Sequence, residues 1–282
     1  MLAQDKIDKG TRNKAVYYIY LAIIAGLLLF AYADNLTWLW SRWMENPNYS
    51  HGPLIPLISL FIVYQKRDAL RNIQISSYGA GLYILIGAVL LYAVSLRAQV
   101  NFLLSYSMIL VLVGTVMFLY GNKTFAALSF PILYLVFMVP FWGSAINKLG
   151  NSLKTVSSIS SHAFLKMLGY PILREGVTLH LGNGSMEVAD PCSGIRSLIS
   201  LLALSTVIAY FSKGSIFKKG ILVLAAVPLA VIGNTLRVVF FGIVLEKKGV
   251  LITEGPLHTL TGIGVFVIAF LGLIALSKWV KA

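Results

Sequence analysis

The chain has 282 residues, of which 58% are hydrophobic and only 12% are charged, and its mean hydropathy is +0.82. A soluble domain carries about 25% charged residues, so this composition excludes an ordinary soluble protein and predicts a chain that lies mostly in lipid. The formal net charge of +13 is spread between apolar segments rather than along one face. We therefore assign the cations to contact with membrane lipids and expect no nucleic acid as a partner.

The apolar segments predict an all-α polytopic membrane protein with about eight transmembrane helices. In chain order we expect them at about residues 16–33, 53–65, 78–96, 102–120, 124–142, 194–211, 221–245 and 257–276. No small-residue cleavage site follows the first segment, so we expect a retained helix rather than a removed signal peptide. We predict that residues 1–282 form a single integral membrane domain.

Lysine and arginine residues fall mainly in the two terminal tails and in alternate connections between the apolar segments. With eight spans these positions all lie on one side of the membrane, which the positive-inside rule assigns to the cytoplasm together with both termini. The pattern is imperfect, because further cations fall on the outer side, among them Lys148, Lys154, Lys166, Arg174, Lys247 and Lys248. Most of these lie in a long outer segment, where the rule has less force.

Two longer segments are then extracytoplasmic. The first, residues 34–52, contains Trp38, Trp40 and Trp43. This spacing is typical of an aromatic belt at the membrane interface, and contact with a substrate is the alternative. The second, residues 143–191, is predicted to be an extracytoplasmic insertion within the membrane domain.

The insertion begins with an apolar stripe formed by Ile146, Leu149, Leu153 and Val156. This stripe predicts an amphipathic helix that lies on the outer surface of the membrane. After Pro171 apolar residues alternate on both sides of Gly182-Asn183-Gly184, which predicts a small β-hairpin before the sixth span. The hairpin leads the chain to Cys192.

Three polar residues on consecutive spans are predicted to lie at one depth: Cys192, Arg237 and His258. Each is 18 to 21 residues from the lysine at the inner end of its helix. At about 1.5 Å per residue this is roughly 27–31 Å, close to one hydrocarbon thickness. We therefore expect all three near the outer boundary of the bilayer.

Each of these residues also has an ordinary explanation. A lone cysteine is often a small apolar core residue, and a histidine at a helix start is often a cap. Arg237 interrupts an apolar run and costs about 2.5–3.5 kcal/mol at a helix centre, although near the boundary it reaches water. Together, a thiol, an imidazole and a guanidinium supply a nucleophile, an acid/base and a cation for an oxyanion.

The sequence around Cys192 suits such chemistry. In Asp190-Pro191-Cys192-Ser193-Gly194 the thiol lies just before a helix, where backbone N–H groups favour a thiolate. Glu187 or Asp190 is a candidate for orienting His258 or Arg237. We expect no cofactor and no metal, because the sequence contains neither a cluster of metal ligands nor a glycine-rich phosphate loop. Cys192 is the only cysteine, so no intrachain disulfide can form.

Three parts of the sequence together resemble the exosortase/archaeosortase family. They are Cys192-Ser193-Gly194-Ile195-Arg196-Ser197-Leu198, then Asn234-Thr235-Leu236-Arg237-Val238 with His258 opening the last helix, and Tyr49-Ser50-His51-Gly52 followed by Pro53-Leu54-Ile55-Pro56-Leu57. The resemblance extends from about Trp38 to the last helix. The residues after the cysteine are more similar to the bacterial form than to the archaeal one.

The resemblance implies a cysteine-type peptidase or transpeptidase of the bacterial inner membrane, with its active site facing the periplasm. Its substrates would be membrane-anchored exported proteins with a tripartite carboxy-terminal tail of the PEP-CTERM type. The family pattern implies that Cys192 is the nucleophile, His258 the general acid/base and Arg237 the oxyanion stabiliser. Further residues that the resemblance or their position makes candidates for substrate contact or support are Arg196, Asn234, Ser193 and His51. For Arg196, substrate contact and a structural ion pair both remain open.

The alternative is a membrane transporter, or an export scaffold, for an envelope polysaccharide or a lipid-linked substrate, in which Arg237 and His258 bind an anion. Proline-interrupted helices suit a transporter. However, the sequence shows no inverted repeat, and its polar residues cluster at one face rather than at the midplane.

Glycines on the last helix allow close helix approach, either inside the protein or against a substrate helix: Gly262, Gly264 and Gly272.

Overall fold

The computed structural model describes residues 22–24, 26–140, 143–188, 194–250 and 255–281. The chain divides into two compact units, and each is described by itself. The first unit comprises Met1–Glu45 and Leu60–Val139, and the second comprises Asn46–Ser59 and Pro140–Ala282. The predicted insertion, residues 143–191, belongs to the second unit.

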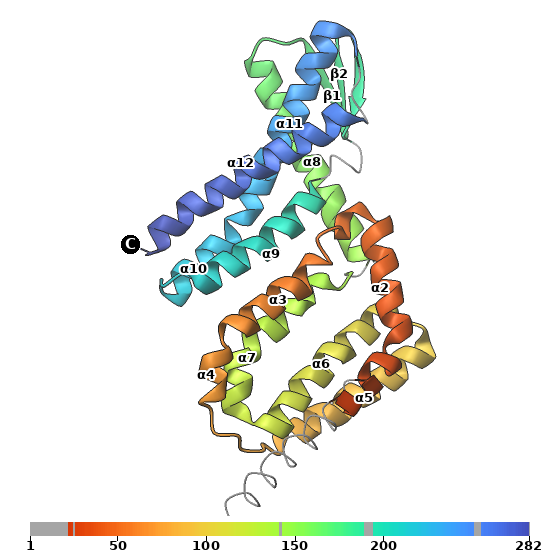
Figure 1. The fold of residues 1–282 in the computed structure, drawn as a ribbon. Helices are drawn as coiled ribbons and strands as arrows, with labels where there is room; N and C mark the ends of the chain where they lie inside the picture. Colours follow the sequence, from red (N-terminus) through yellow and green to blue (C-terminus); the bar gives the residue numbers. More distant parts are fainter. Residues whose placement is uncertain (1–21, 25, 141–142, 189–193, 251–254, 282) are drawn as a thin grey trace, which may run out of the picture. The chain divides into compact units, whose positions relative to one another are not determined.

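The first unit is a set of helices, shown in Figure 1. Its elements are α2 (Ala33–Glu45), α4 (Arg67–Arg71), α5 (Ala80–Ala98), α6 (Asn101–Tyr120), α7 (Asn122–Tyr134) and the 3₁₀ turn η2 (Leu135–Met138), and it includes the end of α3 (Leu54–Gln65). Polar side chains join α2 to α6: Asn35 Nδ2 donates to the carbonyl of Asn101 at 2.8 Å, and Ser105 Oγ donates to Asn35 Oδ1 at 3.0 Å. Interhelical hydrogen bonds of this kind hold membrane helices together where lipid offers no partner.

Helices α5 and α6 form the closest pair of the first unit, and Gly81 makes this approach possible. A Cβ atom added at Gly81 would lie 2.3 Å from the backbone nitrogen of Phe118, whereas one added at Gly87 would meet nothing within 4 Å. Small residues at such crossings let helix backbones touch.

We expect Gly81→Ala to destabilise the protein by about 3 kcal/mol or more, because the new methyl group overlaps backbone that cannot rotate away. Gly87→Ala is the matched control on the same helix, where the change should be neutral or stabilise by up to about 1 kcal/mol. Unfolding of the purified variants in detergent measures both effects. Equal stability of the two variants would contradict this interpretation of the α5–α6 contact.

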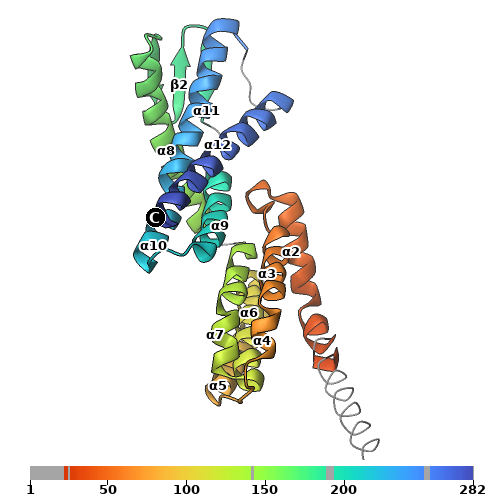
Figure 2. The ribbon, with the colours of Figure 1, turned by 60° about the vertical axis from the view of Figure 1, so that its left-hand side comes forward.

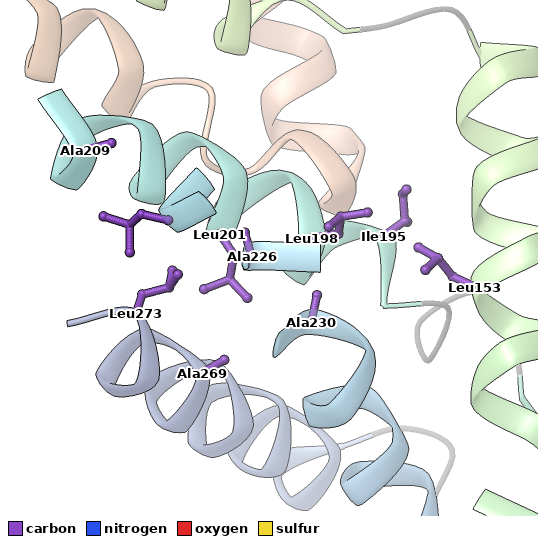
Figure 3. Packing of buried hydrophobic residues seen from close by; sticks show 10 residues of the cluster. Leu153, Ile195, Leu198, Leu201, Ala209, Ala226, Ala230, Ala269 and Leu273 are labelled. Carbon is purple, nitrogen blue, oxygen red and sulfur yellow. The ribbon is translucent and has the colours of Figure 1, made fainter. Parts of the chain in front are cut away.

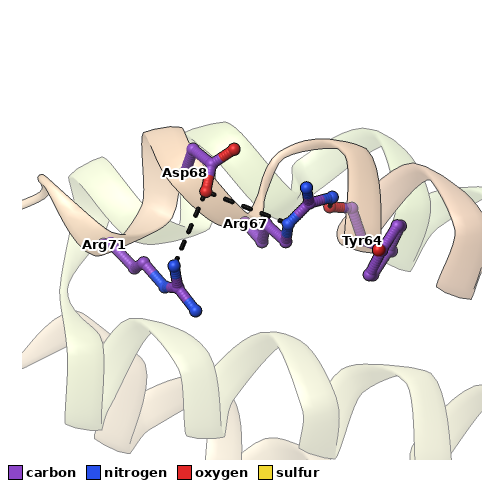
Figure 4. A network of polar contacts seen from close by, with 4 residues as sticks. All are labelled: Tyr64, Arg67, Asp68 and Arg71. Atoms are coloured by element: carbon purple, nitrogen blue, oxygen red, sulfur yellow. Dashed lines mark hydrogen bonds and ion pairs between the residues drawn. The ribbon is translucent and has the colours of Figure 1, made fainter.

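The short basic segment after α3 is exposed, and Figure 4 shows the polar contacts of its side chains. Asp68 Oδ1 lies 3.9 Å from Arg67 Nε and 3.7 Å from an Nη atom of Arg71, and the Arg67 guanidinium lies 4.2 Å from the centre of the Tyr64 ring. Exposed pairs of this kind contribute little to stability. The segment is therefore an exposed cationic connection, and its place on the cytoplasmic side stays a prediction.

The second unit contains a helical core and a small sheet. Its elements are η1 (Pro47–Tyr49), the start of α3, α8 (Gly143–Met167), β1 (Ile172–Glu175), β2 (Thr178–Leu181), β3 (Gly184–Glu187), α9 (Ile195–Phe211), α10 (Ile216–Leu224), α11 (Ala226–Lys248) and α12 (Pro256–Lys281). Leu201 of α9, Ala226 of α11 and Leu273 of α12 lie together in one buried cluster (Figure 3). This cluster holds the three helices that carry the predicted site.

The insertion forms a three-stranded antiparallel sheet in the order β1-β2-β3. The predicted hairpin corresponds to β2 and β3, and the sequence did not indicate β1. Strand β2 lies between α8 and α11 (Figure 2), and one face of the sheet packs on α11 through Leu179, Met186 and Phe241.

Among the residues that the structure describes, four helices are long and apolar enough to cross a membrane, or five if the bent pair Ala22–Ala31 and Ala33–Glu45 counts as one span. The four are Ala80–Ala98, Asn101–Tyr120, Ile216–Lys248 and Pro256–Trp279. The chain is therefore a multi-pass membrane protein, and the number eight stays a prediction. Shorter apolar helices cover Asn122–Met138 and Ile195–Phe211, where two further spans are predicted.

The helix Ile216–Lys248 is longer than the predicted seventh span. Its 33 residues extend roughly 50 Å, and even a tilt of about 40° leaves it longer than a hydrocarbon layer of about 30 Å. Part of this helix must therefore lie outside the hydrocarbon. The end that carries the sheet and the charged residues Glu246, Lys247 and Lys248 is suited to water.

One detail of the predicted outer segments is wrong. Trp43 is buried, and its indole Nε1 donates to the carbonyl of Met138 at 2.8 Å, so it packs inside the first unit instead of anchoring in a belt. The insertion begins with a helix, α8, as predicted, and Leu149 and Val156 of the apolar stripe are each 44% exposed. Contact of this stripe with the membrane surface stays a prediction. The buried face of α8 contains serines, because it packs against polar groups of α11.

Candidate active site

Helix α11 presents Asn234 and Arg237 on one face, because residues three apart in a helix are neighbours. Asn234 is buried, and its Nδ2 donates to Ser157 Oγ of α8 at 2.9 Å. One turn further along α8, Ser161 Oγ donates to the carbonyl of Thr235 at 3.3 Å. These two bonds fix the α11 turn that carries Arg237 against α8. The sequence indicated Asn234 as a candidate but gave no signal for the serines.

The start of α9 lies against the same turn of α11. Gly194, which precedes the first residue of α9, has a φ of +76°, a conformation that favours glycine. A Cβ atom added there would lie 3.2 Å from both Cβ and Cγ of Asn234. The glycine therefore allows the chain to turn into α9 while it touches Asn234. Gly194 is two residues after Cys192 in the sequence.

Arg237 and His258 are in direct contact. His258 lies in the first turn of α12, and Nη2 of Arg237 is 2.9 Å from its ring Nε2, 3.1 Å from Nδ1 and 2.9 Å from its backbone oxygen. A single N–H group cannot point at both ring nitrogens at once, so Arg237 Nη2 donates to either Nδ1 or Nε2 of His258. A guanidinium can only donate, so the ring nitrogen that pairs with Arg237 serves as the acceptor.

Phe241 holds the imidazole from the side of α11. Its ring stacks on that of His258, with centroids 5.5 Å apart and planes inclined by 16°, and the Arg237 guanidinium carbon lies 5.7 Å from its centre. Phe241 is 2% exposed and belongs to the cluster that packs under the sheet. Sequence analysis missed this residue. The available signal was an aromatic side chain four positions after Arg237 on the same helical face.

Gly262 provides the space that the Arg237 guanidinium occupies. A Cβ atom added at Gly262 would lie 3.2 Å from Arg237 Nη2, and one added at Gly272 would lie 3.3 Å from Leu229. A Cβ atom at Gly264 would meet nothing within 4 Å. Two of the three glycines on the last helix therefore serve packing inside the second unit.

The other predicted residues that the structure describes lie in the second unit. Arg196 is the second residue of α9 and is close enough to Arg237 for the two positive charges to interact. No carboxylate of the described residues forms an ion pair with Arg196, and its role stays a prediction. His51 is buried and follows η1, which packs against α9.

Glu187, at the end of β3, makes no hydrogen bond or ion pair with either Arg237 or His258 in the structure, so it does not orient them there. Cys192, Ser193 and Asp190 lie outside the described residues. The predicted meeting of the thiol with the imidazole therefore stays a prediction. Within the described ranges, no group of three or more His, Cys, Asp or Glu residues is arranged to hold a metal ion.

The comparison with protein families matches this chain to the model of the transmembrane exosortase over residues 43–275. The match includes η1, the insertion, Gly194, Asn234, Arg237 and His258. Neither the curated proteins nor the solved structures contain a match to the chain. Because the family match covers most of the 282 residues, the chain belongs to the transmembrane exosortase family.

Proposed function

We propose that this protein is a cysteine-type membrane transpeptidase that cleaves the carboxy-terminal sorting tail of exported, membrane-anchored proteins. In this proposal Cys192 is the nucleophile, His258 the general acid/base and Arg237 the cation that stabilises the oxyanion. The main observation in support of this proposal is the contact between the Arg237 guanidinium and the His258 imidazole. Gly194, two residues after Cys192, packs against the same turn of α11. The family match supports the same class of reaction.

The reaction begins when the Arg237 N–H group leaves the ring nitrogen to which it donates, and the freed lone pair of His258 takes the proton of the Cys192 thiol. The thiolate then attacks the carbonyl carbon of the scissile peptide, and the negative charge that forms on the carbonyl oxygen is stabilised by Arg237. Arginine has five N–H donors in a fixed plane, so one guanidinium serves both the imidazole and an oxyanion.

Collapse of this intermediate breaks the C–N bond. His258 gives its proton to the departing amine, and the acyl group stays on the sulfur as a thioester. An acceptor amine or water then attacks the thioester and gives a proton to His258. The C–S bond breaks, and the sulfur recovers that proton from the imidazole, so the enzyme returns to its starting state.

The length of α11 supports a site at the outer face of the membrane. Arg237 is eleven residues before Lys248, so about 16 Å of helix follows it at a rise of 1.5 Å per residue. This final part of α11 carries the sheet. A substrate anchored by its own transmembrane helix presents its first extracytoplasmic peptide bonds at this depth, just below the sheet.

The test is a precursor-processing assay in cells that express Cys192→Ala, with a membrane-anchored precursor that bears a tripartite tail. We expect the variant to insert and fold as the wild type does and to lose processing by roughly 10³-fold or more, as expected for loss of a nucleophile. Retained processing would contradict the peptidase proposal. A transporter or scaffold tolerates this substitution.

Because Cys192 is the only cysteine, thiol labelling provides a second readout. A membrane-impermeant maleimide added outside spheroplasts should label the wild-type chain and stop processing. Labelling that requires disruption of the membrane would contradict the outward-facing site.

A further inference from the structure

Strand β3 has a free edge, and the hydrogen-bond pattern of the sheet defines what that edge offers. The backbone nitrogen of Val188 donates to the carbonyl of Val177 at 3.0 Å, and these two residues lie directly opposite each other in the β2–β3 register. Bonded pairs alternate in an antiparallel ladder, so Met186 also pairs with β2. The N–H and C=O groups of Ser185 and Glu187 therefore point away from β2, toward the open edge.

Nothing in the described part of the chain satisfies these outward groups. The sheet ends at β3, and the structure shows no hydrogen bond to the backbone of Ser185 or Glu187. Their side chains lie on the exposed face, whereas Met186 between them packs near Gly242 of α11. An edge strand with unpaired backbone groups is a template for another extended chain.

The opposite edge of the sheet, formed by β1, is less suited to pairing with another extended chain. Strand β1 follows Pro171, and α8 packs against it. Proline and a covering helix are two ways in which proteins protect an edge from pairing. By the same alternation, Ile172 and Arg174 direct their backbone groups to this β1 edge.

The β3 edge is also held rigidly to the helix that carries Arg237. At the hairpin tip the backbone N–H of Asn183 donates to Glu246 Oε2 at 3.2 Å, and the side-chain amide of Asn183 donates to the Glu246 carbonyl. Gly184 packs against Leu245. A strand bound at this edge therefore has a fixed position relative to α11, which reduces the ordering cost of binding.

We propose that the substrate binds here by adding a fourth strand: its extended juxtamembrane segment pairs with the outward backbone groups of Ser185 and Glu187. This inference rests on the proposed function, and it adds the mode by which the substrate is held. Cys192 is five residues after Glu187 in the sequence, so the proposed strand pairs with the part of the chain that directly precedes the nucleophile in sequence.

A proline at an outward position tests the pairing, because it removes the outward N–H without breaking a bond to β2. We expect Glu187→Pro to lower the rate of precursor processing at least tenfold. Glu187→Ala keeps the backbone N–H group, so its loss should be several-fold smaller than that of Glu187→Pro, and the ratio of the two rates isolates the backbone group. Arg174→Pro is the matched control, since it places the same ring on the β1 edge. An equal loss in Glu187→Pro and Arg174→Pro, or no loss in either, would overturn the inference.

Cross-linking separates binding from chemistry. A photo-cross-linking amino acid is placed at position 185 or at the exposed position 173 on β1, in the full-length Cys192→Ala chain, with the tailed precursor as the probe. We expect precursor cross-links from position 185 at least fivefold above those from position 173, and we expect Glu187→Pro to remove them.

The two proposals fail in different ways. Absence of precursor cross-links from position 185, or cross-links there to a second copy of this chain, would overturn strand addition whether or not the wild type processes the precursor. Cross-links that form as expected, together with a wild type that leaves the precursor intact, would overturn the peptidase proposal alone.

Discussion

Arg237→Ala is expected to reduce precursor processing about 10²–10³-fold, which is the usual effect of removing one preorganised oxyanion donor. The loss should appear in kcat more than in KM, because the guanidinium acts on charge that develops only in the transition state. The contact of Arg237 with His258 adds to the effect, since the imidazole loses the donor that lies 2.9 Å from its Nε2. Processing rates in proteoliposomes measure both constants.

Arg237→Lys separates charge from geometry. Lysine keeps the positive charge but lacks the planar set of donors, so we expect it to recover less than about a tenth of the wild-type rate. Lys247→Ala, which removes an exposed cation from the last turn of the same helix, is the control and should remain active. A rise in KM with unchanged kcat in Arg237→Ala would assign the guanidinium to substrate binding instead.

Gly262→Val is expected to be the most damaging change among the three glycines of α12. Its Cβ atom would lie 3.2 Å from Arg237 Nη2, and its methyl groups extend further, so the guanidinium must leave its position beside His258. The end of an arginine side chain is flexible, and therefore the fold should survive while processing falls at least about 30-fold, or about 2 kcal/mol at the transition state.

The same helix supplies the control. Gly264→Val introduces the same β-branched residue two positions away, where a Cβ atom meets nothing within 4 Å. Any general cost of valine in this helix appears in both variants, so the ratio of their processing rates isolates the Arg237 contact. A ratio near one would contradict the role of Gly262 as the space for the guanidinium.

The membrane helices were the most predictable part of this fold. Runs of apolar residues near 20 in length are sufficient to predict them, because lipid forces the backbone to pair within each segment. The prediction was less accurate where polar or proline residues intervene. Helix α7 contains Pro131 and changes to the 3₁₀ turn η2 before Pro140, so this region is a shorter apolar helix rather than a regular span.

The insertion was predicted in outline and was wrong in detail. Alternation around Gly182-Asn183-Gly184 predicted β2 and β3, whereas β1 begins with two adjacent apolar residues, Ile172 and Leu173, and gives no alternating signal. The apolar stripe predicted the helix α8, but the sequence did not show that the other face of this helix packs on α11 through serines. Serine and asparagine form such contacts only when both partners are present, which no single segment reveals.

By itself, the sequence determined that this chain resides in a membrane and that Arg237 and His258 lie at similar depth on neighbouring helices. Helical rise is regular, so distance along the chain converts into depth. Only the tertiary structure decided what surrounds that pair: the space at Gly262, the stacked ring of Phe241, and the bond from Asn234 to Ser157. These contacts depend on how α8, α11 and α12 rotate and approach one another, and this follows from packing among distant segments rather than from the period of any one of them.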